Sequence, residues 1–199
     1  MQVILASGSP YRKAQLENFG LRFEAHIPRV NEDELKRRGP TDLVELTRFL
    51  ALEKAQSLRA GFPNAVLLGS DQLVEWNGSR FDKPGTPEAA LAQLSTLQGR
   101  THRLITSLAV LAPAQAALHF TDITEIRLRP LGLDDLKAYI ALDQPLDCAG
   151  SYKIERAGMG LIETIESRDP SAIQGLPLIS LTAAFCQLGI PLAKLWRTP

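Results

Sequence analysis

Several short stretches of this sequence combine small, polar and charged residues in patterns that could bind an anion or a metal ion. The first is Ser7-Gly8-Ser9-Pro10-Tyr11-Arg12-Lys13, which follows an apolar run at residues 3–6. Backbone N–H groups at the start of a helix favour an anion, and Gly8 would let the backbone approach it closely. Arg12 and Lys13 oppose the helix dipole unless an anion such as a polyphosphate is bound there. A capped helix with two surface cations explains the same residues equally well.

The second stretch, Gly69-Ser70-Asp71-Gln72, follows an apolar run at residues 65–68 that is typical of a buried strand. We expect it to form a turn, because α/β folds often hold their ligands where a strand ends. Asp71 could bind a divalent cation there or deprotonate a water molecule. Asp is also frequent in turns that bind nothing, and for this residue taken alone that interpretation is favoured.

Two lysines could supply positive charge to such a site. Lys83 follows a hairpin that is predicted at residues 72–81 from its central Asn-Gly pair. The hairpin would return Lys83 toward Asp71, so that both could flank one phosphate. Lys54 lies on the apolar stripe of a predicted helix, which is an unfavourable place for a charge unless a cleft or a partner meets it.

Two further polar stretches could take part. Glu32-Asp33-Glu34 is an acidic run, which is usually a solvated surface, although Mg²⁺ is typically held by one or two carboxylates. Residues 147–155, Asp-Cys-Ala-Gly-Ser-Tyr-Lys-Ile-Glu, form a compact polar loop that could hold a base or a phosphate, or simply connect two elements. None of these stretches identifies a reaction by itself, but their joint occurrence favours a polyphosphate site.

The elements that must position these stretches alternate between strands and helices. Apolar patterns predict strands at residues 3–6, 65–68, 72–76, 79–81, 101–111, 119–127 and 160–165. Helical spacing and capping residues predict helices at residues 11–19, 41–60, 86–98, 133–142 and 178–188, with Ser9 and Thr41 as the first two caps. This order indicates an α/β fold with a mixed sheet.

The composition is that of an ordinary globular protein and excludes several classes of partner. Lys plus Arg and Asp plus Glu both number 22, so the formal net charge is zero, which argues against binding to duplex nucleic acid. The two cysteines, Cys148 and Cys186, are far apart in sequence, so we expect neither a disulfide framework nor structural zinc. No apolar stretch approaches the roughly 20 residues of a membrane span, and the N-terminus reads as a strand rather than a signal peptide. We therefore expect a cytoplasmic protein with no membrane partner.

Taken together, the polar stretches resemble the motifs of the Maf family. The matching segments are residues 7–12, 69–72, 82–84 and 148–155, followed by Gly175-Leu176-Pro177, and they cover nearly the whole chain in the order of the family. The resemblance implies one domain, 1–199, with an α/β fold in which an elongated mixed β-sheet flanked by helices forms two lobes around a deep cleft. It also implies a cytoplasmic enzyme that cleaves nucleoside triphosphates to monophosphates and pyrophosphate with a divalent cation, Mg²⁺ or Mn²⁺. Whether the protein forms a homodimer is left open.

The resemblance also implies roles for single residues. Asp71 matches the catalytic acid–base position of the family, and Glu32 together with Asp71 matches the residues around the metal. The residues that match the phosphate-binding positions of the family are Ser7, Arg12, Lys54 and Lys83. At residues 30–32 the Val-Asp-Glu of the family reads Val-Asn-Glu, so one carboxylate is missing beside the metal, and at residues 82–84 its Gly-Lys-Pro reads Asp-Lys-Pro. These departures concern the affinity for metal more than the activity.

Three positions separate the branches of the family by substrate. The branch that acts on dTTP and UTP has Arg, Thr and Gln where this sequence has Tyr11, Gln72 and Glu155. An aromatic residue, Gln and Glu at these positions are similar to the branch that acts on 7-methyl-GTP. Methylation at N7 makes guanine cationic, so Tyr11 could stack on the ring with a cation–π contribution, and Glu155 could accept hydrogen bonds from its N1–H and amine. Trp76 is a second aromatic residue that could stack on the base.

We therefore expect a pyrophosphatase that removes 7-methyl-GTP from the nucleotide pool as 7-methyl-GMP and pyrophosphate. Two alternatives stay open. One is a preference for dTTP or UTP, and the other is a nucleotide-binding regulator of cell division with little turnover, because Maf proteins are also linked to septum formation. The joint presence of Asp71, Lys54 and Lys83 favours turnover, since binding alone would not require an acid–base carboxylate.

Overall fold

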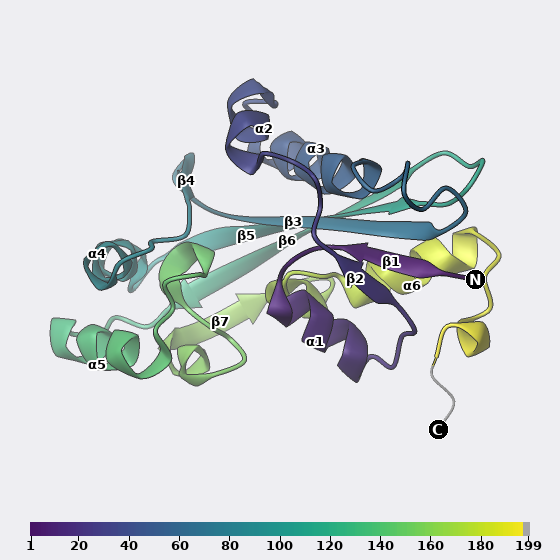
Figure 1. Ribbon diagram of the computed structural model, residues 1–199. Coiled ribbons are helices and arrows are strands. Elements are labelled where there is room, and N and C mark those ends of the chain that lie inside the picture. Colours follow the sequence, from purple (N-terminus) through teal and green to yellow (C-terminus); the bar gives the residue numbers. More distant parts are fainter. Residues whose placement is uncertain (197–199) are drawn as a thin grey trace. The chain divides into compact units, whose positions relative to one another are not determined.

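The computed structural model describes residues 1–196, and Figure 1 shows its helices and strands. The strands are β1 (Val3–Ala6), β2 (Glu24–His26), β3 (Val66–Trp76), β4 (Ser79–Phe81), β5 (Thr101–Leu111), β6 (Leu118–Leu128) and β7 (Ile162–Glu166). The helices are α1 (Pro10–Asn18), α2 (Glu32–Arg38), α3 (Leu43–Gln56), α4 (Pro87–Leu97), α5 (Leu133–Asp143) and α6 (Leu178–Gln187). Short 3₁₀ turns lie at η1 (Ala149–Ser151), η2 (Ala157–Leu161), η3 (Pro170–Gln174) and η4 (Leu192–Lys194). None of the helices in this described part of the chain has the length and apolar character that a membrane span requires.

The strands form one mixed sheet, which confirms the predicted α/β fold class. The strand order is β2-β1-β3-β5-β6-β7, with β4 paired to β3. β1 runs parallel to both β2 and β3, whereas β4 is antiparallel to β3 and β7 is antiparallel to β6. The chain divides into two compact units. Unit 1 comprises residues 1–72, 106–122 and the chain from residue 171 onward, and unit 2 comprises residues 73–105 and 123–170.

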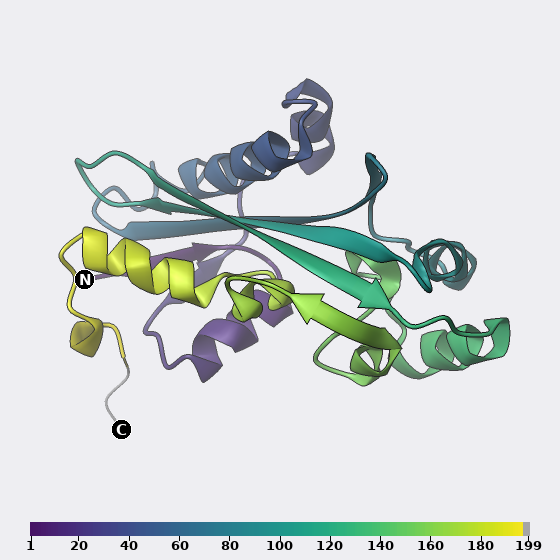
Figure 2. The same ribbon diagram turned by 180° about the vertical axis from the view of Figure 1, so that it is seen from behind.

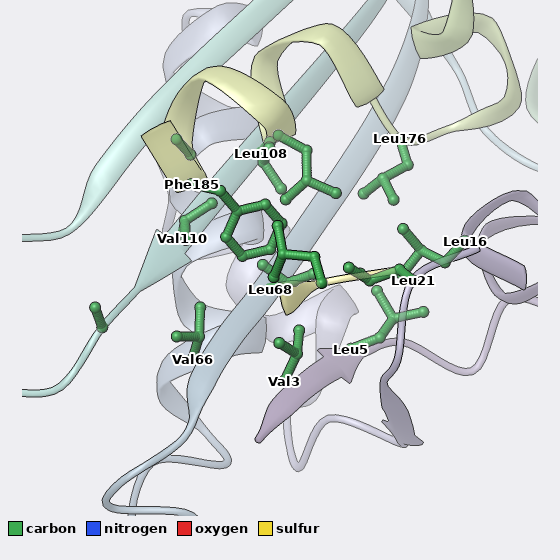
Figure 3. Packing of buried hydrophobic residues seen from close by; sticks show 14 residues of the cluster. Val3, Leu5, Leu16, Leu21, Val66, Leu68, Leu108, Val110, Leu176 and Phe185 are labelled. Atoms are coloured by element: carbon green, nitrogen blue, oxygen red, sulfur yellow. The ribbon is translucent and has the colours of Figure 1, made fainter. Parts of the chain in front are cut away.

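Unit 1 has three layers, because its central strands bury both faces. Val3 and Leu5 of β1 point to one side, into a cluster that includes Phe185 of α6 (Figure 3). Ile4 and Ala6 point to the other side, into a cluster with residues of α3. Figure 2 shows α6 from behind, lying along the sheet of unit 1. A strand that is covered on both faces reads as a continuous apolar run, which is why the sequence has Val-Ile-Leu-Ala here and not an alternating pattern.

Capping side chains fix the starts of α1 and α3. Ser9 caps α1, as predicted, and Pro10 occupies the first turn. The predicted cap of α3 at Thr41 is wrong, because Asp42 occupies that position and its Oδ1 accepts a hydrogen bond from Glu45 N at 2.9 Å. A carboxylate at the cap satisfies a free N–H and also favours the positive end of the helix dipole.

The largest difference from the predicted elements concerns residues 69–72. The sequence predicts a turn there, but β3 continues unbroken from Val66 to Trp76. The turn prediction is wrong because the polar side chains find partners inside the fold. Ser70 donates to a backbone carbonyl of β5 at 2.8 Å, and Asp71 accepts from Lys54 Nζ at 2.6 Å. Partners from other elements allow a polar sequence to continue through a buried strand.

The acidic run at residues 32–34, expected as a solvated surface, begins helix α2. Asn31 caps this helix through its Oδ1, which accepts from Glu34 N at 3.1 Å. The three acidic residues occupy the first turn, and Lys36, Arg37 and Arg38 the last, so the charges complement the helix dipole. Periodicity does not reveal the helix, because Leu35 is the one buried residue that it contributes.

Unit 2 contains the predicted hairpin. Asn77 and Gly78 both have positive φ, 51° and 77°, and β3 pairs with β4 on either side of them. The helix predicted at residues 86–98 is α4, which begins at Pro87 after the cap at Thr86. The strand predicted at residues 160–165 begins two residues later, at Ile162, because the preceding residues form η2. Gly158 packs directly on the backbone of the residues before it, which holds this stretch in a turn.

Candidate active site

The polar turn after β1 brings Ser7 and Arg12 together. Ser7 is 7% exposed, and its Oγ accepts hydrogen bonds from Ser9 N at 3.1 Å and from Arg12 Nη1 at 3.5 Å. Ser9 caps α1 by accepting from Arg12 N at 3.4 Å. Two of the predicted phosphate-binding side chains are therefore in contact at the start of one helix.

The guanidinium of Arg12 lies within electrostatic reach of both predicted metal-site carboxylates. Its Nε donates to the carbonyl of Gly175 at 2.8 Å. Burial lowers the pKa of Arg12 from its ordinary value, while the negative charges of Asp71 and Glu32 act in the opposite direction. A guanidinium remains protonated even so, and Arg12 thus contributes a permanent positive charge beside two acids.

Lys54 joins Asp71 and Glu32. Its Nζ lies 2.6 Å from Asp71 Oδ1 and 3.0 Å from Glu32 Oε1. Lys54 is 5% exposed and Asp71 is 4% exposed, whereas the Glu32 side chain is 46% exposed. This contact explains the charge on the apolar stripe of α3, because a buried ammonium needs a counter-charge. The structure therefore brings together four of the predicted residues of unit 1, namely Arg12, Glu32, Lys54 and Asp71.

A glycine allows this contact to form. Gly69 and Asp71 are two residues apart on β3, so both face α3. A Cβ on Gly69 would collide with the carbonyl oxygen of Ala51 and lie 2.9 Å from the Cβ of Ala55. Because there is no side chain at residue 69, α3 can pack directly on β3, and Lys54 reaches the carboxylate of Asp71.

The second carboxylate oxygen of Asp71 fits a cation. Oδ2 is buried and has no hydrogen-bond partner among residues 1–196. A buried anionic oxygen without a partner is costly, and a divalent cation or the proton of a water molecule would satisfy it. The described residues contain no group of three or more His, Cys, Asp and Glu side chains that could hold a metal. Asp71 with Glu32 therefore fits Mg²⁺ chemistry, in which one or two carboxylates act together with substrate phosphates, and not a cage made by the protein alone.

Two of the predicted specificity residues also lie in unit 1. Tyr11 is the second residue of α1 and is half-buried. Gln72 follows Asp71 on β3, and its side chain points away from α3, because neighbouring residues of a strand face opposite sides. Its Nε2 donates to Thr106 Oγ1 and to the carbonyl of Ala172, both at 2.9 Å.

This geometry can be compared with known proteins. A family model described as Maf-like protein matches residues 2–188. The chain belongs to the Maf-like protein family. The family predicted from the short motifs is thus confirmed over almost the whole length of the chain.

Several curated relatives of this Maf-like chain are named 7-methyl-GTP pyrophosphatase. The 7-methyl-GTP pyrophosphatase of Xanthomonas axonopodis pv. citri (strain 306) is 39% identical over 188 residues, which cover 94% of this chain and 97% of that protein. The 7-methyl-GTP pyrophosphatase of Bdellovibrio bacteriovorus is 42% identical over 181 residues, covering 90% and 93%. The solved structure of the Staphylococcus aureus Ham1 protein aligns with 95% of this chain and all of that chain, at 14% identity and a TM-score of 0.46, which is too low a likeness to support an inference.

The family motif that contains Lys83 lies in unit 2, in the loop after β4. Lys83 is exposed, and the loop around it is fixed through its backbone. The carbonyl of Asp82 accepts from Gln93 Nε2 at 2.8 Å, and Gly85 N donates to the carbonyl of Leu146 at 3.0 Å. The structure thus presents the Lys83 ammonium on a loop whose two sides are held.

Glu155 lies at an exposed turn before η2, and α5 holds both ends of this turn. Tyr139 Oη accepts from Lys153 N at 2.9 Å, and Asp143 Oδ2 accepts from Gly158 N at 3.1 Å. A Cβ on Gly158 would collide with the backbone of Lys153, so the glycine lets the ends of the turn close on each other. The carboxylate of Glu155 is thus carried by a closed turn that is anchored to a helix.

One residue that the motifs do not reveal joins the two polar loops of unit 2. Gln93 of α4 donates to the carbonyl of Asp82 beside Lys83, and its Oε1 accepts from Ser151 Oγ at 2.7 Å. Ser151 belongs to the polar loop that leads to Glu155. Nothing in the sequence pattern marks Gln93, because a glutamine on a helix surface is commonplace.

The base of the Glu155 loop is buried. Tyr152 Oη and His102 Nε2 lie 2.9 Å apart, with relative exposures of 7% and 2%. Burial lowers the pKa of His102 to about 4, although the negative charge of Glu75 acts in the opposite direction, and burial raises the pKa of Tyr152. His102 is therefore neutral at pH 7. The other aromatic candidate for base stacking, Trp76, carries the guanidinium of Arg100 over its ring at 4.7 Å, so that face of the ring is covered.

The two departures from the motifs of the family have local explanations. Asn31, in place of the usual Asp, keeps the capping function, because its Oδ1 accepts from the N–H of Glu34. Asp82, in place of the usual Gly, pairs with Arg80, whose Nη2 lies 3.0 Å from Asp82 Oδ2. Neither change removes a residue of the Lys54–Asp71–Glu32 cluster.

Proposed function

We propose that this Maf-like protein hydrolyses 7-methyl-GTP to 7-methyl-GMP and pyrophosphate and so removes the methylated nucleotide from the pool. The relatives with that name, 39% and 42% identical over at least 90% of the chain, support the substrate. Tyr11, Gln72 and Glu155, which match the 7-methyl-GTP branch and not the dTTP/UTP branch, support it independently. An aromatic ring such as that of Tyr11 and a carboxylate such as that of Glu155 are the kinds of group that favour a flat cationic base.

One observation carries the proposed chemistry. The carboxylate of Asp71 is buried, one oxygen is held by Lys54, and the other has no hydrogen-bond partner in the described part of the chain. In the proposed reaction a water molecule attacks a phosphorus of the triphosphate, and the bond from that phosphorus to the α–β bridging oxygen breaks. Asp71 accepts the proton that the water loses and releases it to solvent after turnover.

Positive charge offsets the charge that develops on the phosphates. We assign this role to Arg12 and Lys54 of unit 1 and, from the family motif, to Lys83. When bound at Asp71 with Glu32, a divalent cation such as Mg²⁺ or Mn²⁺ supplies further positive charge for the leaving pyrophosphate. Exhaustive chelation should therefore abolish turnover and added Mg²⁺ should restore it. Full turnover in the presence of a chelator would refute the metal requirement.

The proposed compartment is the cytoplasm. Within residues 1–196, Cys148 and Cys186 are not joined in a disulfide, which suits a compartment that keeps thiols reduced. A fusion to a fluorescent protein, expressed at native level, tests this by microscopy and fractionation.

The deciding experiment is pyrophosphate release from 7-methyl-GTP, GTP, UTP and dTTP by the full-length protein. The highest kcat/KM should be for 7-methyl-GTP. A preference for UTP or dTTP would transfer the protein to the other substrate branch. Binding of nucleotides without turnover on any of them would favour the alternative of a regulator of cell division.

A further inference from the structure

Residues 171–176, which we call the carbonyl segment, include all of η3 except Pro170. Side chains of other elements hold this segment through its backbone oxygens. Gln15 of α1 donates from Nε2 to the carbonyls of Ser171 and Leu176, both at 2.7 Å, which uses both amide protons. Gln15 is 5% exposed, and its Oε1 has no hydrogen-bond partner among the described residues. The amide is therefore held by these two bonds.

Gln72 of β3 holds the middle of the same segment. Its Nε2 lies 2.9 Å from the carbonyl oxygen of Ala172 and 3.2 Å from that of Ile173. It also lies 2.9 Å from Thr106 Oγ1, which in turn donates to the Ala172 carbonyl at 3.1 Å. An amide has two protons, and those of Gln72 are engaged by groups of its own protein. They are thus poorly placed to read a nucleotide base, which is the role that its position among the specificity residues suggests.

The carbonyl segment orients Arg12. The oxygen of Gly175 accepts from Arg12 Nε at 2.8 Å and lies 2.8 Å from Ser70 Oγ. Gly175 has φ of +98°, a conformation that other residues rarely adopt, and a Cβ there would lie 3.1 Å from Arg12 Nε. A hydrogen bond at Nε fixes the plane of the guanidinium, and its Nη groups remain the ones that can face an anion.

We propose that Gln72 is a positioning residue for phosphate binding. Together with Gln15 it fixes the carbonyl segment, and the Gly175 carbonyl of that segment fixes the guanidinium of Arg12. The inference rests on the phosphate-binding role proposed for Arg12. It assigns Gln72 to the triphosphate and not to the base. Because Gln72 is the neighbour of Asp71 on β3, the same contacts also hold the strand that carries the proposed acid–base residue.

Inorganic tripolyphosphate, which has no base, separates the two roles as a competitive inhibitor. Gln72→Met keeps the length of the side chain and loses both amide donors. The inhibition constant of tripolyphosphate and the KM of every nucleotide should rise by one common factor, roughly tenfold. The ratio of kcat/KM between 7-methyl-GTP and UTP should stay at the wild-type value. Gln15→Met should act in the same direction, and Gln187→Met, which changes an exposed residue of α6, should alter neither quantity.

A double-mutant cycle with Arg12→Lys tests the route through Arg12. Lys keeps the positive charge but has no Nε to bond to the Gly175 carbonyl, so in this background Gln72→Met should raise the tripolyphosphate constant only slightly. If the factor by which the double variant raises the tripolyphosphate constant equals the product of the two single factors, the inference is overturned. If Gln72→Met does not fold, Gln15→Met takes its place in the cycle, because it holds the same segment from α1.

Two further outcomes are decisive. An unchanged tripolyphosphate constant together with an altered nucleotide ratio would overturn the inference and make Gln72 a base-reading residue. Wild-type protein that does not bind tripolyphosphate would overturn it as well. A wild-type preference for UTP or dTTP, in contrast, would contradict the proposed substrate and leave the tripolyphosphate measurements on Gln72 intact as a test.

Discussion

The two units of the molecule hold their chemistry-bearing residues in different ways. In unit 1, Lys54 and Asp71 are buried, and each side chain is fixed by opposite charge. In unit 2, Lys83 and Glu155 are exposed, and the fixed part is the backbone on either side of them. The bond breaking proposed for unit 1 needs a set geometry and a set charge before the substrate arrives, which burial and pairing provide. Under the proposed function, Lys83 and Glu155 contact the substrate from anchored loops that leave their charged groups in water.

Removal of the buried cation should have the largest effect of any change that tests this contrast. Lys54→Met removes the ammonium that is paired directly with the buried Asp71, and the loss of one partner of a buried pair costs about 3–5 kcal/mol of unfolding free energy. Urea unfolding measures this loss. Lys13→Met is the matched control, because Lys13 pairs with Glu17 at 3.9 Å on the surface of the same unit and should lose at most about 1 kcal/mol. Equal losses in the two variants would show that burial does not strengthen the pair.

Acid should weaken unit 2 through His102. The pKa of His102 in the folded protein, about 4, is below the value of about 6.5 that is typical of an unfolded chain, so unfolding binds a proton between these two values. Its contribution is complete above pH 6.5 or so and is lost as the pH falls toward 4, by on the order of 3 kcal/mol. Unfolding free energies of the wild type and of His102→Gln, measured across this window, should converge toward low pH. Parallel curves would contradict a neutral, buried His102.

Substitution of the proposed acid–base residue should affect turnover and spare the fold. Asp71→Asn keeps an oxygen that can accept from Lys54, and Glu32, 3.0 Å from Lys54 Nζ, still offsets the charge of the ammonium. The carboxylate of residue 71 is lost, so kcat for 7-methyl-GTP should fall at least about 100-fold. Circular dichroism checks that the variant is folded. Asp33→Asn, which removes one exposed carboxylate in the first turn of α2, is the control and should keep the wild-type kcat. Near-normal turnover in folded Asp71→Asn would eliminate this mechanism.

A change at the exposed turn of unit 2 should affect specificity and spare stability. Glu155→Gln replaces an acceptor oxygen by a donor and removes the charge that opposes a cationic base. The kcat/KM for 7-methyl-GTP should therefore fall, by an amount that corresponds to a loss of roughly 1–3 kcal/mol of transition-state stabilisation. The loss for UTP should be smaller. Glu166→Gln, an exposed carboxylate on β7, serves as the control. Equal losses on every nucleotide would remove Glu155 from base recognition.

The smallest effect is expected at the proposed stacking residue. Tyr11→Ala should weaken the use of 7-methyl-GTP by about 0.5–2 kcal/mol, because it removes a ring that can stack on the cationic base. Unmethylated GTP should lose less, since its ring is neutral. Kinetics with both nucleotides measure the difference, and Tyr11→Phe should retain most of the wild-type preference. If Tyr11→Ala impairs both nucleotides equally, Tyr11 acts through the start of α1 and not through the base.

Local signals in the sequence predict most of the secondary structure. Sequence alone predicts the apolar run of β1, the cap at Ser9 and the Asn-Gly hairpin, because each depends only on residues that are close together in the chain. The continuation of β3 through Asp71 could not, because polarity at residues 69–72 is the usual sign of a turn. The partners that bury those residues come from far along the chain, such as Lys54, 17 residues away, and Gly175, 105 residues from Ser70.

The sequence predicts which residues belong to the candidate site but not how they contact one another. The motifs select Arg12 and Asp71, and Lys54 stands out as a charge on the apolar stripe of a predicted helix. Neither signal shows that Lys54 lies between two acids. The sequence does not predict a role for Gln93 or Gln15, because each forms hydrogen bonds to the backbone of a loop or segment that is distant in the chain. Such bonds leave no mark in composition or periodicity.

Gly69 has no functional group, yet its lack of a side chain sets how closely α3 packs on β3 beside the site. Any side chain there would meet the backbone of α3 at Ala51, and α3 carries Lys54. A side chain at residue 69 would push α3 away from β3 and so displace Lys54, although residue 69 and Lys54 need not touch. The absence of a side chain at residue 69 therefore sets the distance between the helix and the strand, and a larger residue there would act on the ion pair from outside it.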